Sequence, residues 1–334
     1  MQEALKLKND KYASLAAYYH LLYYYNRCEQ DSVAKWIVKM EPLVQKSGLW
    51  DYFFDARRFQ IDLYTFTEQY ELAISEANKM KQKALDIDNN RGTVAAYQCL
   101  SNAYIGSQRW DEGLKALEEA YRLLPKNGNA VVHISVLSQL ISVTKEMKDN
   151  YRQLKYLQEL ENVLRKFIID NLSLKDGFAD VFIFNEIFYA HYYLNTNQPQ
   201  IAYSHIEKSK KYLTENTYFM YKVLYYDIYA KYYQSIKQYQ QASAYIDTTL
   251  TMLKKDFTSD YAEQLLKQAK IWVEAGDNNR ATTLYQQALA IKDSAAMALS
   301  NTQMEQIKKS YNLDKIELEQ QKQTNQIRLI SLIV

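Results

Sequence analysis

The fold of this chain is decided by residues 97–125, which read YQCLSNAYIGSQRWDEGLKALEEAYRLLP. Within this stretch, Leu100 and Ser101 follow Tyr97 by three and four positions, and Tyr104 follows them by four and three. Residues spaced in this way share one face of an α-helix. The first half of the stretch therefore predicts a helix whose buried face carries aromatic, large and small side chains.

The second half of the stretch predicts another helix that packs against the first. Gly113, Leu117 and Ala120 again share one helical face, and the polar run at residues 106–109 forms the turn between the two halves. Pro125 ends the second helix, because proline cannot continue one. A single helical hairpin of this kind cannot bury its apolar side, so we expect neighbouring hairpins to stack on it.

The same spacing returns about every forty residues along the chain. The copy at 130–167 places a large residue at the small position, and the interval after it is expected to accommodate a loop around Asn171 to Gly177. We predict seven hairpins from these copies. Their marker residues are Ala34, Ala73, Gly113, Leu154, Ala202, Ala242 and Ala281, at intervals of 39, 40, 41, 48, 40 and 39 residues.

Composition favours an all-helical fold and excludes several classes of function. The chain has only 7 Gly and 3 Pro in 334 residues, and no long run alternates polar and apolar residues as a strand would. A net charge of +2, without a basic stripe, argues against nucleic-acid binding. Most of the clustered tyrosines are expected to pack between helices, and a subset is expected to line a recognition surface.

Catalytic, cofactor and metal sites have no support in the sequence. Its four histidines, His20, His133, His191 and His205, form no metal-binding motif, although His191 and His205 could meet across one hairpin near Glu186. There is no glycine-rich phosphate loop and no nucleophile elbow. Cys28 and Cys99 lie about two repeats apart, so we expect no disulfide between them, and Cys99 is expected to be buried. We predict a protein that is not an enzyme, with no cofactor and no metal.

The C-terminal part of the chain differs from the repeats. Residues 294–326 contain no Gly or Pro and predict a long helix that caps the array and continues as a stalk. Residues 327–334 are nearly all apolar but are too few to cross a membrane, which needs roughly 20 residues. We interpret them as the start of a truncated transmembrane helix. The alternative is that they fold back on the last repeat or pair with a second copy.

The spacing in residues 97–125 resembles the tetratricopeptide repeat (TPR), a helix-turn-helix unit of 34 residues. This resemblance implies an all-α, right-handed superhelix of about seven helical hairpins over residues 1–293. Together with the C-terminal helix, the array is similar to the extracytoplasmic sensor region of bacterial membrane-anchored regulators of the histidine kinase type. That similarity implies a periplasmic region of an inner-membrane signal transducer, and a homodimer in the full-length protein. The alternative is a stand-alone adaptor for protein partners, with the cytoplasm as its alternative location.

A superhelix of hairpins has a concave groove lined by the first helix of each hairpin, and such grooves bind peptides or proteins. We expect this groove to hold the partner, and the segment beyond Val334 to contact the membrane. Ligand binding that favours one curvature would then change the direction of the C-terminal helix. The repeat frame places eleven residues toward the groove: Tyr19, Tyr23, Arg58, Asp62, Gln98, Asn102, His191, Asn195, Asp227, Lys231 and Lys270.

Overall fold

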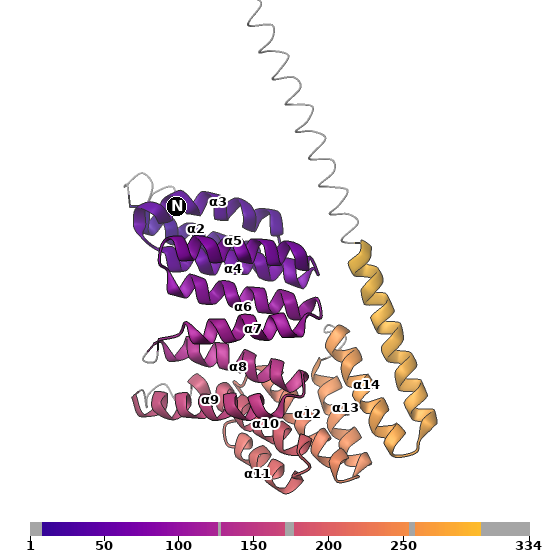
Figure 1. The fold of residues 1–334 in the computed structure, drawn as a ribbon. Coiled ribbons are helices and arrows are strands. Elements are labelled where there is room, and N and C mark those ends of the chain that lie inside the picture. The colour runs from indigo at the N-terminus through magenta and orange to yellow at the C-terminus, as the bar shows by residue number, and fades with distance from the viewer. Residues whose placement is uncertain (1–8, 126–127, 171–176, 254–257, 302–334) are drawn as a thin grey trace, which may run out of the picture. The chain divides into compact units, whose positions relative to one another are not determined.

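The computed structural model describes residues 9–125, 128–170, 177–253 and 258–301, and within these ranges the chain is helical and contains no strand. It divides into two compact units, residues 1–228 and 229–334. The first unit holds the helices from α2 to α11 and most of α12 (Figure 1). Their bounds are α2 (Asp10–Tyr25), α3 (Gln30–Ser47), α4 (Trp50–Phe66), α5 (Tyr70–Asp86), α6 (Asn90–Gly106), α7 (Trp110–Arg122), α8 (Ala130–Glu146), α9 (Asn150–Asp170), α10 (Ala179–Asn195), α11 (Pro199–Lys210) and α12 (Phe219–Ser235).

The second unit begins within α12 and contains α13 (Tyr239–Leu253), α14 (Thr258–Glu274) and a further helix at residues 278–301. Across both units, consecutive helices form seven pairs, from α2 with α3 to α14 with residues 278–301. The predicted all-α array of seven hairpins is therefore confirmed in the described part of the chain.

All seven pairs are joined by the same backbone turn. One residue of each turn has a positive φ, and the residue after it donates its N–H to a carbonyl five positions earlier, as Arg109 does to Tyr104 at 2.7 Å. This bond is the one that ends a helix in a Schellman motif. Only one of the seven positions holds glycine. The residues are Cys28, Glu68, Gln108, Lys148, Asn197, Lys237 and Gly276.

The turns correct the sequence frame in two copies. In each pair, the residue five positions after the positive-φ residue donates its N–H to a carbonyl four positions earlier. That carbonyl belongs to the residue that directly follows the positive-φ residue, as when Gly113 donates to Arg109 at 3.0 Å. By this criterion Val33 and Gln153, and not Ala34 and Leu154, correspond to Gly113. Helical periodicity could not separate neighbouring residues in the weak copies, because the turn that defines their register has no distinctive sequence.

Glycine allows close helix packing at two positions of the first unit. A Cβ atom added to Gly113 would lie 2.6 Å from Cγ1 of Ile105, in the preceding helix. One added to Gly92 would lie 2.6 Å from Cγ of Phe54, in α4. These distances are far below a normal carbon–carbon contact. Glycine at these positions thus permits close approach within one pair and between consecutive pairs.

Both cysteines are free, and Cys99 is buried in the core of the first unit whereas Cys28 is exposed, so the prediction for them is confirmed. Residues 278–301 form one helix that continues through position 293. The rest of the predicted stalk, the apolar segment 327–334 and most of the loop expected at Asn171 to Gly177 lie outside the described residues. None of the described helices combines the length and the hydrophobicity that a membrane span requires.

Candidate binding surface

The first helices of the four N-terminal pairs, α2, α4, α6 and α8, are linked in turn by side-chain contacts. Tyr18 of α2 packs edge-on against Tyr52 of α4, with ring centroids 5.1 Å apart. The remaining helices are linked by polar groups, which are described below. We call the side chains of these four helices that are not buried in the core the first-helix surface.

Tyr19 and Tyr23 are the most exposed predicted residues of this surface. Their exposed fractions are 64% and 56%, although other tyrosines of α2, such as Tyr24 and Tyr25, pack against the core. Tyr19 contacts Tyr18 edge-on at 5.7 Å, and the guanidinium of Arg27 lies 5.4 Å from the ring of Tyr23. The structure thus divides the tyrosines of α2 into packing residues and residues available to a partner.

Arg58 and Asp62 lie one turn apart on α4, and both are half-buried. Neither side chain makes a hydrogen bond or an ion pair with any described residue, although the guanidinium of Arg58 lies 4.9 Å from the ring of Phe59. Burial raises the pKa of Asp62 to about 6, and the positive charge of Arg58 opposes that rise. A donor group and an acceptor group therefore lie one turn apart, and neither side chain is hydrogen-bonded or ion-paired within the described chain.

The surroundings of Arg58 include an ion-paired cluster that the sequence frame did not identify. Arg91 of α6 donates to Asp55 of α4 at 2.9 Å and lies 3.6 Å from Asp51. Burial is the main cause that raises the pKa of both Asp55 and Tyr18. Helical spacing could not reveal this cluster, because its members come from different pairs and meet only after stacking.

Side-chain amides connect α6 to α8. Gln98 donates to Oε1 of Gln139 at 2.7 Å and to the hydroxyl of Ser135 at 3.1 Å, and Gln139 donates to Asn102 at 3.4 Å. The structure thus brings the predicted residues Gln98 and Asn102 together through Gln139. Adding the repeat interval to Gln98 would have led to Gln139, so a signal for this residue was present in the sequence.

The other predicted residues have different environments. His191 and Asp227 are buried, with exposed fractions of 5% and 9%, so their side chains are largely inaccessible to a partner. Asn195 is exposed at the end of α10. Lys231 is half-buried and Lys270 is exposed, and both belong to the second unit.

His205 interacts with Glu186, and the ring of His191 packs near Phe188 instead, 5.9 Å between centroids. Nδ1 of His205 lies 2.6 Å from Oε2 of Glu186, and its ring stacks on Tyr189 and Tyr193 at 5.0 and 5.3 Å. No group of three or more His, Cys, Asp or Glu side chains able to hold a metal ion occurs among the described residues.

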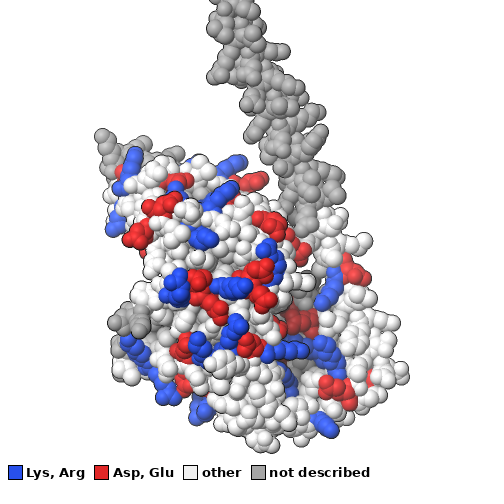
Figure 2. Space-filling view, viewed as in Figure 1, with Lys and Arg blue, Asp and Glu red and all other residues white. Residues whose placement is uncertain are grey.

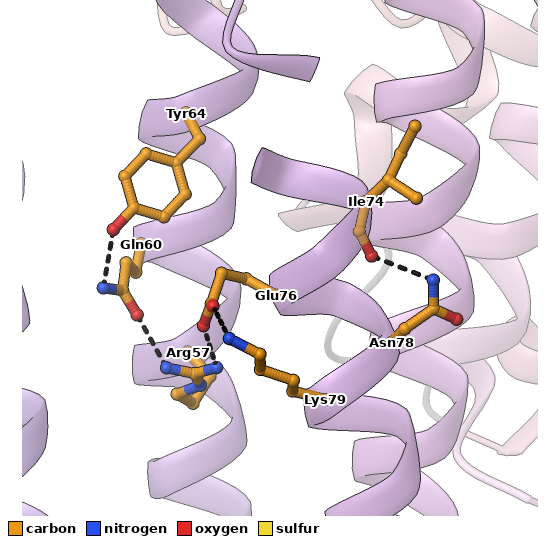
Figure 3. A network of polar contacts seen from close by, with 7 residues as sticks. All are labelled: Arg57, Gln60, Tyr64, Ile74, Glu76, Asn78 and Lys79. Atoms are coloured by element: carbon orange, nitrogen blue, oxygen red, sulfur yellow. Dashed lines mark hydrogen bonds and ion pairs between the residues drawn. The ribbon is translucent and has the colours of Figure 1, made fainter. Parts of the chain in front are cut away.

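A second polar network lies between α4 and α5 (Figure 3). Arg57 donates to Glu76 at 2.7 Å and to Gln60 at 2.9 Å, and Gln60 donates to the hydroxyl of Tyr64. Lys79 also donates to Glu76, at 2.7 Å. Burial opposes the ionisation of Glu76, but the hydrogen bonds from Lys79 and Arg57 outweigh it and lower the pKa of Glu76. Because this network is internally satisfied, it stabilises the pair and offers little to a ligand.

Charged side chains of both signs are interspersed on the face of the molecule seen in Figure 2, and this face has no stripe of one sign over the first unit. This face of the first unit therefore offers no broad electrostatic field of one sign.

Neither a family model nor a curated protein sequence matches this chain. Solved structures share its fold. Aspartyl phosphate phosphatase F from Bacillus subtilis superposes with a TM-score of 0.61, covering 86% of this chain and 74% of that chain at 11% identity. A Rap protein complexed with competence and sporulation factor gives 0.60, with 84% and 76% coverage and 11% identity.

A third similar structure is a signal transduction ATPase with a tetratricopeptide repeat sensor from Pyrococcus horikoshii. It gives a TM-score of 0.57, with 86% of this chain and 43% of that chain covered, at 16% identity. At such low identities these similarities establish the fold alone: the chain is a TPR-like array of helical hairpins.

Proposed function

We propose that this chain is a non-catalytic scaffold that binds an extended peptide or protein segment on its first-helix surface. The observation that carries the proposal is the pair Arg58 and Asp62, two half-buried polar side chains that make no hydrogen bond or ion pair with any described residue. A guanidinium has five N–H donors, and a partly desolvated donor gains most from a partner that supplies acceptors. A peptide offers carbonyl oxygens to Arg58 and N–H groups to Asp62.

The neighbouring side chains suit the same ligand. Side-chain amides both donate and accept, so Gln98, Asn102 and Gln139 can exchange their mutual hydrogen bonds for bonds to a peptide main chain. Tyr19 and Tyr23 add exposed aromatic area, which interfaces use as anchors. The Rap protein found among similar structures was crystallised with competence and sporulation factor, which is consistent with a binding role for this architecture.

Site-specific photo-crosslinking in the native host tests this proposal. A benzophenone amino acid at Tyr19 should capture a peptide or protein, which mass spectrometry would identify, and Arg58→Ala should reduce its yield several-fold. The matched control is the same amino acid at Tyr151, a tyrosine of the second helix α9 with an exposed fraction of 83%. Equal capture of the same molecule from Tyr151, or a yield unaffected by Arg58→Ala, would refute recognition by the first-helix surface.

We further propose that binding is transmitted through the C-terminal helix to a membrane-anchored, dimeric signalling protein, with this region in the periplasm. The support is the uninterrupted helical sequence of residues 294–326 and the apolar residues 327–334. Inserting Gly-Pro near Gln320 in the full-length protein should uncouple signalling from binding, because it interrupts that helix. Unchanged signalling would favour the alternative, a stand-alone adaptor.

The absence of catalysis is also part of the proposal. Because one similar structure is an aspartyl phosphate phosphatase, acetyl phosphate is an informative test substrate. We expect the purified chain to leave its hydrolysis rate at the level of buffer alone, since no set of nucleophile, base and acid was found in the sequence. Saturable hydrolysis by the chain would contradict this expectation.

A further inference from the structure

The second unit contains a cleft that the sequence did not indicate. It lies between α13, α14 and the helix at residues 278–301, and its volume is about 610 Å³. Its walls include Ser243 and Asp247 of α13, Gln268 and Trp272 of α14, and Arg280. This site is separate from the first-helix surface, because all of its residues belong to the second unit.

Gln268 provides an acceptor that has no partner among the described residues. Its side chain is only 5% exposed, and its amide nitrogen donates to Oδ1 of Asp247 at 2.7 Å and to the hydroxyl of Ser243 at 2.9 Å. An ionised carboxylate only accepts hydrogen bonds, so the amide orientation is fixed with nitrogen toward Asp247. The carbonyl oxygen of Gln268 is therefore left without a hydrogen bond from the described chain.

Asp247 contributes a negative charge that no described cation balances. It is exposed, it accepts the bond from Gln268, and it forms no ion pair in the described part of the chain. By contrast, Arg280 is neutralised by Asp277, with Nε of Arg280 3.2 Å from Oδ2 of Asp277. Asp247 thus leaves the cleft with an unbalanced carboxylate beside an unfilled acceptor.

Trp272 provides a surface that already accommodates a cation. The guanidinium carbon of Arg280 lies 4.5 Å from the centroid of the indole ring. Tryptophan is the best aromatic partner for such cations. Because the side chain of Arg280 is 63% exposed, displacing it from the indole removes little buried contact.

We propose that this cleft binds an arginine or lysine side chain of a partner protein. The basic group donates to Asp247 and to the carbonyl oxygen of Gln268, and it replaces Arg280 on the face of Trp272. A neutral donor can hydrogen-bond to these acceptors but lacks the charge attraction to Asp247, and an acidic side chain is repelled by it. In the free protein, Arg280 occupies the face of Trp272 that the partner's basic side chain would use, and it therefore competes with that side chain.

The test is a titration of the full chain, labelled with ¹⁵N at the indole nitrogens, with N-acetyl-Gly-Arg-Gly-amide. The chain has 4 Trp residues, and Trp272→Phe identifies the signal of Trp272. We expect a saturable shift of that signal and a binding constant weakened about tenfold for the isosteric peptide with neutral citrulline, as loss of the charge predicts.

Three variants complete the test. Asp247→Asn should weaken binding of the arginine peptide about tenfold, whereas Asp293→Asn, an exposed carboxylate outside the cleft, should leave it unchanged. Arg280→Gln should strengthen binding, because it removes the competing cation. The proposal is overturned if the arginine peptide causes no saturable shift, if citrulline binds equally well, or if Asp247→Asn has no effect. Weaker binding by Arg280→Gln would overturn the competitive role of Arg280.

Discussion

Glu186 and His205 form a close pair across α10 and α11, with 2.6 Å between Oε2 and Nδ1, at positions equivalent to those of Arg57 and Glu76 in α4 and α5. The equivalence follows from the turns. The first member of each pair lies eleven residues before the positive-φ residue of its turn, Asn197 or Glu68, and the second member lies eight residues after it. The acidic partner lies on the second helix in one pair and on the first helix in the other. These two pairs thus place a polar contact at the same repeat positions, with the acidic side chain on opposite helices.

The ion pair of Arg57 and Glu76 is predicted to stabilise the first unit. The exposed fractions of the two side chains are only 16% and 14%, so removing one partner leaves a poorly solvated charge. We expect Glu76→Gln to lower the free energy of unfolding by about 1.5–3 kcal/mol, as for other hydrogen bonds to charged groups. Denaturant unfolding measures this change, and a double-mutant cycle with Arg57→Ala isolates the pairwise part.

The matched control is Glu119→Gln, which breaks the pair of Glu119 with Arg122. That pair joins exposed side chains on a single helix, and its loss should change the free energy of unfolding by less than about 0.5 kcal/mol. Equal effects of the two substitutions would show that partial burial contributes nothing to the Arg57–Glu76 pair.

Asp62 is predicted to make stability fall as the pH rises. Its pKa is about 6 in the folded chain and about 3.9 when unfolded, so the folded state holds the extra proton between these values. Stability should therefore decrease as the pH rises from about 4 to about 6 and then stay constant, with a total change of at most about 3 kcal/mol. Asp62→Asn should abolish this contribution.

The measurement compares the free energies of unfolding of the two proteins at several pH values. The advantage of Asp62→Asn over the wild type should grow across this pH interval, and Asp293→Asn serves as the exposed control. Parallel curves for wild type and Asp62→Asn would contradict an elevated pKa for Asp62.

The turn at Gln108 is predicted to be strained by its side chain. Its φ is 63°, a conformation that costs non-glycine residues roughly 1–2 kcal/mol. Replacement by glycine recovers only part of this cost, because glycine is more flexible in the unfolded chain and loses more conformational entropy on folding. We expect Gln108→Gly to raise the free energy of unfolding by about 0.5–1 kcal/mol.

The reverse substitution provides the control. Gly276 has a φ of 83°, and an added Cβ meets no atom within 4 Å, so Gly276→Ala tests backbone strain alone. It should destabilise the chain by about 1 kcal/mol. If both substitutions left stability unchanged, strain at the turns would be negligible.

Gln153 is predicted to be replaceable by an apolar residue. It occupies the position that holds glycine or alanine in five other pairs, its exposed fraction is 0%, and its Oε1 atom has no hydrogen-bond partner among the described residues. Its amide nitrogen makes only a long 3.5 Å bond to the carbonyl of Phe188. We therefore expect Gln153→Met to keep or raise the free energy of unfolding, by up to about 1 kcal/mol.

Gln60→Met is the matched substitution at a satisfied glutamine. Gln60 is also buried, but it accepts from Arg57 and donates to Tyr64, so its loss should cost about 1–3 kcal/mol. Urea unfolding of the two variants decides the question. A larger loss for Gln153→Met than for Gln60→Met would mean that Gln153 has a polar role inside the pair.

Sequence determined the number of hairpins and the helical class, because these depend on local spacing. The residues that share a helical face lie three or four positions apart, and the turn in residues 97–125 is one of seven such turns in the described part of the structure. Buried Cys99 and the close packing at Gly113 also followed from this frame.

Tertiary structure decided the register of the weak copies and the surroundings of each candidate residue. Val33 and Gln153 replaced the expected markers once backbone hydrogen bonds defined the turns. The link from Gln98 to Gln139 joins side chains of two consecutive pairs that lie 41 positions apart in the chain. The burial of His191 likewise became evident only in the structure. Periodicity describes one helix at a time, so only the stacking of pairs reveals which polar groups become partners and which, like Arg58, make no hydrogen bond or ion pair with the described residues.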